Sequence, residues 1–208
     1  MKFKKKIKSR WHQHRLKDVF FNKAKKLGYR SRAAFKLLEI NKKFRILKKG
    51  QNALDIGASP GGWSQILSQK VFSNEKRNKI ISVDLKDFKP IDNVLSIKKN
   101  IYDDDFILLL KKYFSDGIDI IVSDAAPSTT GNKFVDHIKN VELCERSFEI
   151  AKNLLNKGGI LVIKIFDGKE TGRLCNLIKK KFLQFNLYKP KSSKSESKEI
   201  YIITKFLK

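Results

Sequence analysis

The glycine-rich segment at residues 55–65, Asp-Ile-Gly-Ala-Ser-Pro-Gly-Gly-Trp-Ser-Gln, constrains the fold of this 208-residue chain more than any other feature. A short apolar run, 52–56, leads into it, and helical spacing over 61–72 follows. A strand that enters a glycine-rich turn and opens a helix is typical of open α/β sheets, which bind ligands beyond the carboxyl ends of their strands. Because glycine has no Cβ, such a turn lets the backbone approach a ligand closely. The segment therefore predicts a ligand-binding α/β domain.

Strand-like and helical patterns alternate along the rest of the chain. The patterns predict further strands over 80–85, 94–97, 118–123, 160–165, 182–188 and 200–204, and further helices over 11–26, 31–40, 106–114, 135–155 and 171–181. Helices of this length between strands imply parallel pairing through βαβ crossovers. The last two strands have no helix between them and predict an antiparallel hairpin. Ser31 is the predicted N-cap of the second helix.

Positive charge is concentrated at the two ends of the chain, which carries 46 Lys and Arg against 21 Asp and Glu. Residues 1–50 hold 19 basic and 2 acidic residues, residues 179–208 hold 9 and 2, and the middle of the chain is close to neutral. Basic flanks around a neutral core favour a polyanion-binding surface, with nucleic acid as the first candidate. Lysines that only solvate the surface are the alternative. An anionic membrane is a weaker one, because no strongly amphipathic basic helix is evident.

Composition excludes several other classes. Hydrophobic residues make up 41% of the chain, which is enough for a core and excludes disorder throughout. No apolar run reaches the about 18 residues of a transmembrane helix, and no apolar stretch of a secretory signal follows the basic N-terminus. Cys144 and Cys175 provide neither a disulfide framework nor the spacing of metal ligands, so we expect no metal site and a reducing, intracellular location.

An acidic residue follows the glycine-rich segment at the distance that an adenosine ligand requires. Asp84 ends the next predicted strand, 22 residues after Gly62. A carboxylate at this place can accept hydrogen bonds from the two hydroxyls of a ribose. The Pro60-Gly61-Gly62 turn differs from the GxGxxG turn of NAD enzymes, which disfavours an NAD-dependent oxidoreductase.

A carboxylate follows one further predicted strand, and a lysine lies within another. Asp124 follows the apolar run Ile118–Ser123, and Lys164 interrupts the apolar run 160–166. A buried ammonium group is costly unless it is paired, and Asp124 is the predicted partner of Lys164. A lysine in such a setting can act as a base. An Asp124 that only caps the next helix and a Lys164 that reaches solvent from an edge strand are the structural alternatives.

Together these motifs resemble the FtsJ/RrmJ (RlmE) family of S-adenosylmethionine-dependent ribose 2′-O-methyltransferases. The resemblance rests on four segments in the family's order, 24–37, 55–65, 123–127 and 197–201. It implies a Rossmann-like methyltransferase fold, with a seven-stranded, mostly parallel sheet and an antiparallel C-terminal hairpin. A single domain over 1–208 would then comprise a basic, RNA-binding helical extension at 1–40 and a cofactor-binding catalytic core at 51–208.

The resemblance also implies the site residues. The catalytic tetrad of the family falls on Lys36, Asp124, Lys164 and Glu199. The residues that would bind S-adenosylmethionine are Gly57, Gly61, Gly62, Trp63, Asp84, Asn100 and Asp124. Asn100 stands where the family commonly has an Asp that accepts a hydrogen bond from the adenine amino group. An Asn oxygen can accept the same bond.

The substrate that the resemblance implies is a uridine in the A-loop of 23S rRNA, within the large ribosomal subunit. The protein would be a cytoplasmic monomer without a membrane or metal partner. Basic residues of the extension would contact phosphates, and Trp11, His12 and His14 could contact bases. Methylation of organellar rRNA or of tRNA is the alternative within the enzyme class. A non-catalytic RNA-binding protein of ribosome assembly is the alternative outside it.

Overall fold

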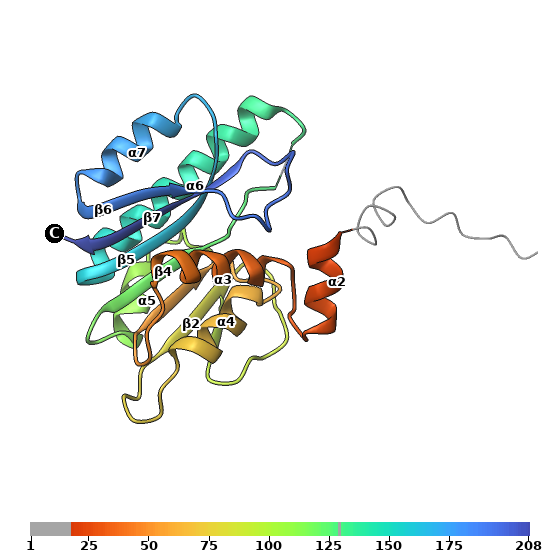
Figure 1. Ribbon diagram of the computed structural model, residues 1–208. Helices are drawn as coiled ribbons and strands as arrows, with labels where there is room; N and C mark the ends of the chain where they lie inside the picture. Colours follow the sequence, from red (N-terminus) through yellow and green to blue (C-terminus); the bar gives the residue numbers. More distant parts are fainter. Residues whose placement is uncertain (1–17, 129) are drawn as a thin grey trace, which may run out of the picture.

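The computed structural model describes residues 18–128 and 130–208 and contains one seven-stranded sheet, in the order β3-β2-β1-β4-β5-β7-β6 (Figure 1). The strands are β1 Ala53–Ile56, β2 Ile80–Asp84, β3 Leu95–Lys98, β4 Ile118–Ser123, β5 Leu155–Phe166, β6 Phe182–Tyr188 and β7 Glu199–Leu207. Strands β1 to β5 pair in parallel, whereas β7 is antiparallel to both β5 and β6. The predicted α/β fold with its C-terminal hairpin is therefore confirmed.

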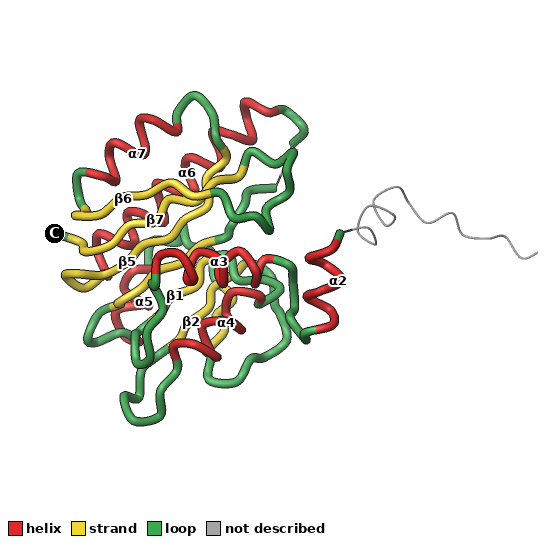
Figure 2. Tube along the Cα trace, viewed as in Figure 1, coloured by secondary structure: helices red, strands yellow, loops and turns green. Residues whose placement is uncertain are grey.

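Helices pack on both faces of the sheet. Figure 2 shows the helices in red and the strands in yellow. The helices are α2 Val19–Lys26, α3 Ala33–Phe44, α4 Gly62–Val71, α5 Phe106–Tyr113, α6 Lys133–Leu154 and α7 Thr171–Lys179. The predicted helix over 11–26 is seen from Val19 onwards, and Trp11, His12 and His14 lie outside the described residues. In the described part of the chain, no helix has the length and apolar character needed to cross a membrane.

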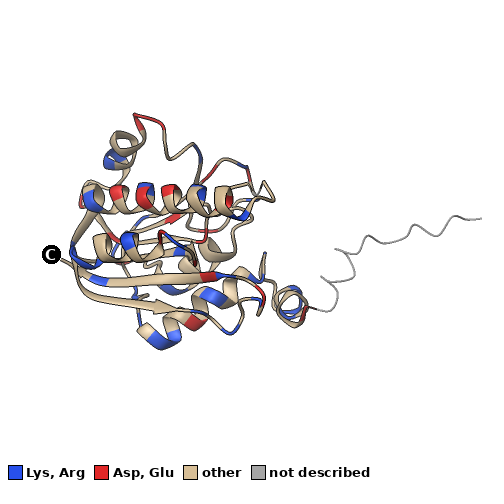
Figure 3. Ribbon diagram, turned by 90° about the horizontal axis from the view of Figure 1, so that it is seen from above, with Lys and Arg blue, Asp and Glu red and all other residues tan. Residues whose placement is uncertain are grey.

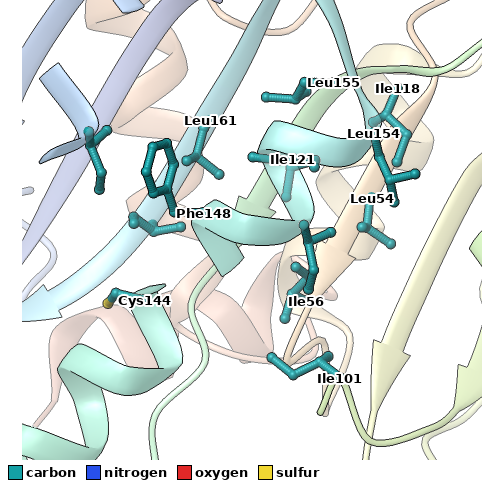
Figure 4. Packing of buried hydrophobic residues seen from close by; sticks show 14 of the residues in the cluster. Leu54, Ile56, Ile101, Ile118, Ile121, Cys144, Phe148, Leu154, Leu155 and Leu161 are labelled. Atoms are coloured by element: carbon teal, nitrogen blue, oxygen red, sulfur yellow. The ribbon is translucent and has the colours of Figure 1, made fainter. Parts of the chain in front are cut away.

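Two apolar clusters lie on the two faces of the sheet. Helices α5, α6 and α7 pack on one face, where Leu161 of β5 meets Phe148 of α6 (Figure 4). Helices α3 and α4 pack on the other face, against Val162 of β5 and Tyr201 of β7. Side chains alternate between the faces along a strand, so Lys164 shares the face of Val162. The strand therefore directs the Lys164 side chain toward α3.

The structure corrects one prediction at the start of α3. Ser31 is not the N-cap, because the helix begins at Ala33 and its N-cap residue, Arg32, makes no side-chain capping bond. The Ser31 hydroxyl is instead buried and has no hydrogen-bond partner among the residues that the structure describes. It lies against Gly62, where an added Cβ would be 2.2 Å from Ser31 Oγ. Gly62 thus permits the close approach of α4 to the start of α3.

We predict that Gly62→Ala lowers the free energy of unfolding by about 1–3 kcal/mol, the usual cost of overpacking. Adding Ser31→Ala should recover most of this loss, because Ser31 Cβ is 3.4 Å from the new Cβ, an ordinary contact distance. Urea denaturation of both single variants and the double variant measures the coupling. If Gly62→Ala lowers the free energy of unfolding as much in the Ser31→Ala background as in the wild type, the proposed clash is disproved.

Candidate active site

A cavity of about 620 Å³ opens at the carboxyl ends of the parallel strands. Its walls come from the loops that follow β1, β2, β3 and β4, and from α6. Gly57, Asp84, Asn100 and Asp124 all line it. The fold therefore brings together four residues that the sequence analysis assigned to cofactor binding, although they span 68 positions of the chain.

Backbone hydrogen bonds fix the Asp84 carboxylate at the cavity wall. The amide of Ser59 donates to Oδ2 at 2.9 Å, and the amide of Lys86 donates to Oδ1 at 2.8 Å. Each carboxylate oxygen keeps a second lone pair that can accept a ligand hydroxyl. The Asn100 oxygen accepts a bond from the Tyr102 amide at 3.1 Å, so the acceptor expected to face adenine is already partly used.

Gly57 brings two loops of the cavity into contact. Its φ is +73°, and an added Cβ would lie 2.4 Å from Ala125 Cβ. The loops that follow β1 and β4 therefore touch, with Asp124 next to the contact.

The other three predicted cofactor residues do not line the cavity. Gly61 and Gly62 pack against the segment that precedes α3, close to Arg30 and Ser31. Trp63 is 2% exposed, its Nε1 donates to the Ala33 carbonyl at 2.8 Å, and its ring lies 5.7 Å from that of Tyr201. The structure gives the Trp63 side chain a packing role between α4, α3 and β7.

Lys164 and Asp124 form a buried ion pair beside the cavity. Because Ser123 of β4 pairs with Ile163 of β5, the next residues of both strands lie side by side. Lys164 Nζ is 3.0 Å from Asp124 Oδ1 and donates to the Asp124 carbonyl oxygen at 2.6 Å. The predicted pairing is confirmed, and Lys164 does not reach solvent from an edge strand, since β5 lies between β4 and β7.

Lys36 and Glu199 form a second buried pair next to the first. Lys36 Nζ of α3 lies 2.8 Å from Glu199 Oε1 and donates to Oε2 at 2.9 Å. The same ammonium group is 3.7 Å from Asp124 Oδ1. The four residues of the expected tetrad, drawn from positions 36 to 199, thus form one network of alternating charge.

Tyr201 joins this network, and the sequence analysis gave it no role. Its hydroxyl donates to Asp124 Oδ1 at 2.6 Å. Burial alone would raise the pKa of Asp124, but the nearby ammonium groups of Lys164 and Lys36 and the Tyr201 hydroxyl lower it below its usual value. Burial and the Asp124 charge raise the pKa of Tyr201, so its hydroxyl stays protonated as a donor. The sequence did contain a signal for this role. Tyr201 lies two residues after Glu199, at the start of a predicted strand, so the two side chains share one face of the sheet.

Comparison with known proteins identifies the family. A model of FtsJ-like methyltransferases matches residues 29–206. The ribosomal RNA large subunit methyltransferase E of Rickettsia bellii is 42% identical over 197 residues, which cover 94% of this chain and 87% of that protein. The protein of the same name from Wolbachia pipientis is 41% identical, with 91% and 95% coverage. The chain belongs to the FtsJ-like methyltransferase family.

Solved structures agree with this family assignment. A crystal structure from Plasmodium falciparum that is described as a ribosomal RNA methyltransferase superposes with a TM-score of 0.75 and 38% identity, covering 86% of this chain and 98% of that one. A structure from Clostridium thermocellum has a TM-score of 0.54 at 17% identity and covers 84% and 96%, which supports the methyltransferase fold alone.

A further carboxylate of this methyltransferase, that of Asp55, lies buried below the glycine-rich loop. Asp55 of β1 accepts a hydrogen bond from Ser64 Oγ of α4 at 2.6 Å, and Ser82 Oγ of β2 donates to Ser64 Oγ at 2.8 Å. Burial raises the pKa of Asp55 to about 7, although the Ser64 bond opposes the shift and the charges of Asp124 and Asp84 add to it. Asp55 therefore ties three elements under the loop and titrates near neutral pH.

We predict that the free energy of unfolding falls as pH rises from about 4 to about 7 and then levels off. The folded state keeps a proton on Asp55 that the unfolded chain releases above its ordinary pKa near 4, so folding becomes less favourable over this range. Asp55→Asn, which keeps the shape and an acceptor for Ser64, should remove this dependence. Denaturation curves at several pH values measure it, and an unchanged slope in the variant would contradict the raised pKa.

Proposed function

We propose that this protein transfers a methyl group from S-adenosylmethionine to a ribose 2′-hydroxyl of ribosomal RNA in the large subunit, at a uridine of the 23S rRNA A-loop, in the cytoplasm. The observation that carries the proposal is the network of Lys36, Asp124, Lys164 and Glu199 at the border of the cavity. The names of the Rickettsia and Wolbachia relatives support the choice of substrate.

The cavity suits a nucleoside cofactor such as S-adenosylmethionine. Asp84 presents a fixed carboxylate for the two ribose hydroxyls, and Ile101 and Leu85 supply apolar surface for a base. Asp124 Oδ2 has no hydrogen-bond partner among the described residues, so it is available to an ammonium group such as the methionine amine. S-adenosylmethionine would supply a methyl group on a sulfonium, which an aligned nucleophile displaces in line.

The network can position and activate a ribose hydroxyl. Lys164 places two of its three ammonium hydrogens on Asp124 and has one left for the 2′-oxygen. We assign Lys164 one of two roles: as an ammonium group it aligns this oxygen through its remaining hydrogen, or as a neutral amine it takes the hydroxyl proton while the oxygen–methyl bond forms and the methyl–sulfur bond breaks. Glu199 holds Lys36 next to Asp124, so that a second ammonium group faces the place where the ribose oxygen would be aligned.

We predict that the purified protein binds S-adenosylmethionine and not NAD in calorimetry. Asp84→Ala should weaken this binding by roughly 1.5–3 kcal/mol, because it removes a charged acceptor from the ribose. Asp84→Asn, which keeps the shape and one acceptor oxygen, is the matched control and should lose less. Binding of NAD without S-adenosylmethionine would reject the proposed cofactor.

We predict that Lys164→Ala lowers the rate of methyl transfer about 10²–10⁴-fold, the range for a group in acid–base catalysis. Lys164→Arg should fail as well, because a guanidinium does not deprotonate and has a different shape. Single-turnover methylation of large ribosomal subunits with saturating S-adenosylmethionine measures the rate, and a melting curve monitors the fold. Lys169→Ala, an exposed lysine in the loop after the same strand, is the control.

To identify the target, the protein is incubated with labelled cofactor, total RNA and ribosomal subunits. The new 2′-O-methyl groups are then mapped. Methylation of tRNA, or of a base, would replace the proposed substrate. A Lys164→Ala variant that keeps more than about a tenth of the rate would limit Lys164 to a structural ion pair with Asp124.

A further inference from the structure

The described residues separate charge between the two edges of the sheet. We call the edge where β1, β2, β4 and β5 begin the amino edge, and the edge that holds the cavity the carboxyl edge. Segments at the amino edge contain eleven Lys and Arg against two Asp and Glu; they are 45–52, 72–79, 114–117, 155–159, 180–181 and 205–208. Segments at the carboxyl edge contain ten against nine; they are 27–32, 57–61, 85–94, 99–105, 124–132, 167–170 and 189–198.

The amino-edge segments form one continuous border. Asn78 Nδ2 donates to the Gln51 carbonyl at 2.6 Å, and Asn52 Nδ2 donates to the Gly117 carbonyl at 3.0 Å. The chain end joins the border where the Lys208 amide donates to the Lys181 carbonyl at 3.0 Å. In Figure 3 the C-terminus marks this edge, and blue segments gather around it.

Helix stabilisation accounts for part of this charge. Helices α4 to α7 end at the amino edge, and cations favour the negative end of the helix dipole. Lys49, Lys79 and Lys208 donate to carbonyls at the ends of α4, α5 and α7, at 2.9, 2.5 and 3.2 Å, and Lys205 donates to the last carbonyl of α3. Four of the eleven cations are thereby explained.

The other seven cations have no such role. They are Arg45, Lys48, Lys76, Arg77, Lys157, Lys180 and Lys181. All seven are exposed, and none makes a side-chain hydrogen bond or an ion pair within the described part of the chain. Lys76, Arg77 and Lys79 also line a polar hollow of about 110 Å³, together with the carboxylate of Asp116.

We infer that the amino edge is a second RNA-docking surface, which binds backbone phosphates on the side of the domain opposite the catalytic network. Unpaired, exposed cations attract phosphates and release counterions on binding, without reading sequence. Phe206 is the one large apolar side chain that the structure exposes in these segments, whereas a membrane-binding surface needs several such anchors. The inference rests on the proposed function, since it assumes an RNA substrate large enough to contact both edges.

The test compares two triple variants that each lose three positive charges. The amino-edge variant carries Lys48→Gln, Arg77→Gln and Lys157→Gln, and the control variant carries Lys89→Gln, Lys133→Gln and Lys169→Gln, all at exposed positions on the cavity side. Binding to protein-free large-subunit rRNA is measured at several salt concentrations. The slope of log K against log salt should become less steep by about 2–3 for the amino-edge variant, because each lost phosphate contact removes about 0.7–0.9. For the control variant the slope should change by less than about one.

An amino-edge variant with the same salt slope as the wild type would overturn the inference, and so would wild-type binding to phosphatidylserine vesicles in preference to rRNA. Calorimetry with S-adenosylmethionine should give the same Kd for all three proteins, which shows that the cavity is intact. Because this experiment measures binding without methyl transfer, its failure is distinct from a failure of the proposed reaction, which the methylation map detects.

Discussion

The ion pair between Lys164 and Asp124 is the interaction on which the carboxyl edge of this protein depends. An ammonium group in an apolar strand between two other strands is tolerated only with a fixed counter-charge, and the β4–β5 register provides one. Asp124 in turn needs further donors because it is buried, and Lys36 and Tyr201 supply them from α3 and β7. The paired charge thus connects α3 and the C-terminal hairpin to this part of the sheet.

The charges of the molecule serve two different purposes. Inside the network, each lysine has a carboxylate within 3.0 Å, so the group is almost neutral and is suited to local chemistry. At the amino edge the cations are exposed and mostly without partners, so their field extends into solvent and acts on large anions over about a Debye length, near 8 Å at physiological salt. Separation of the two groups keeps the long-range field away from the reacting atoms.

Sequence reasoning predicted most of the fold and half of the site. The strands over 118–123 and 182–188 match the structure at both ends, because continuous apolar runs between turn residues leave little choice of boundary. Lys164 and Asp124 could be paired in advance because Asp124 follows one apolar strand and Lys164 lies within the strand expected beside it. Lys36 and Glu199 came only from the family resemblance, since each is one charged residue among many and their contact depends on how α3 crosses the sheet. Ser31 was misassigned because a helix start can be set by packing, here against Gly62, instead of by a side-chain cap.

The contact between Gly57 and Ala125 links the size of the cavity to the position of the ion-pair network around Asp124. Gly57 has no side chain, and an added Cβ at this position would lie 2.4 Å from Ala125 Cβ. A larger residue at either position would push apart the loops after β1 and β4, and Asp124, which directly precedes Ala125, would move with them. The cavity therefore cannot be widened at this point for a bulkier cofactor without also displacing the carboxylate that holds Lys164. The shape of the cavity and the geometry of the ion-pair network are mechanically coupled in this protein.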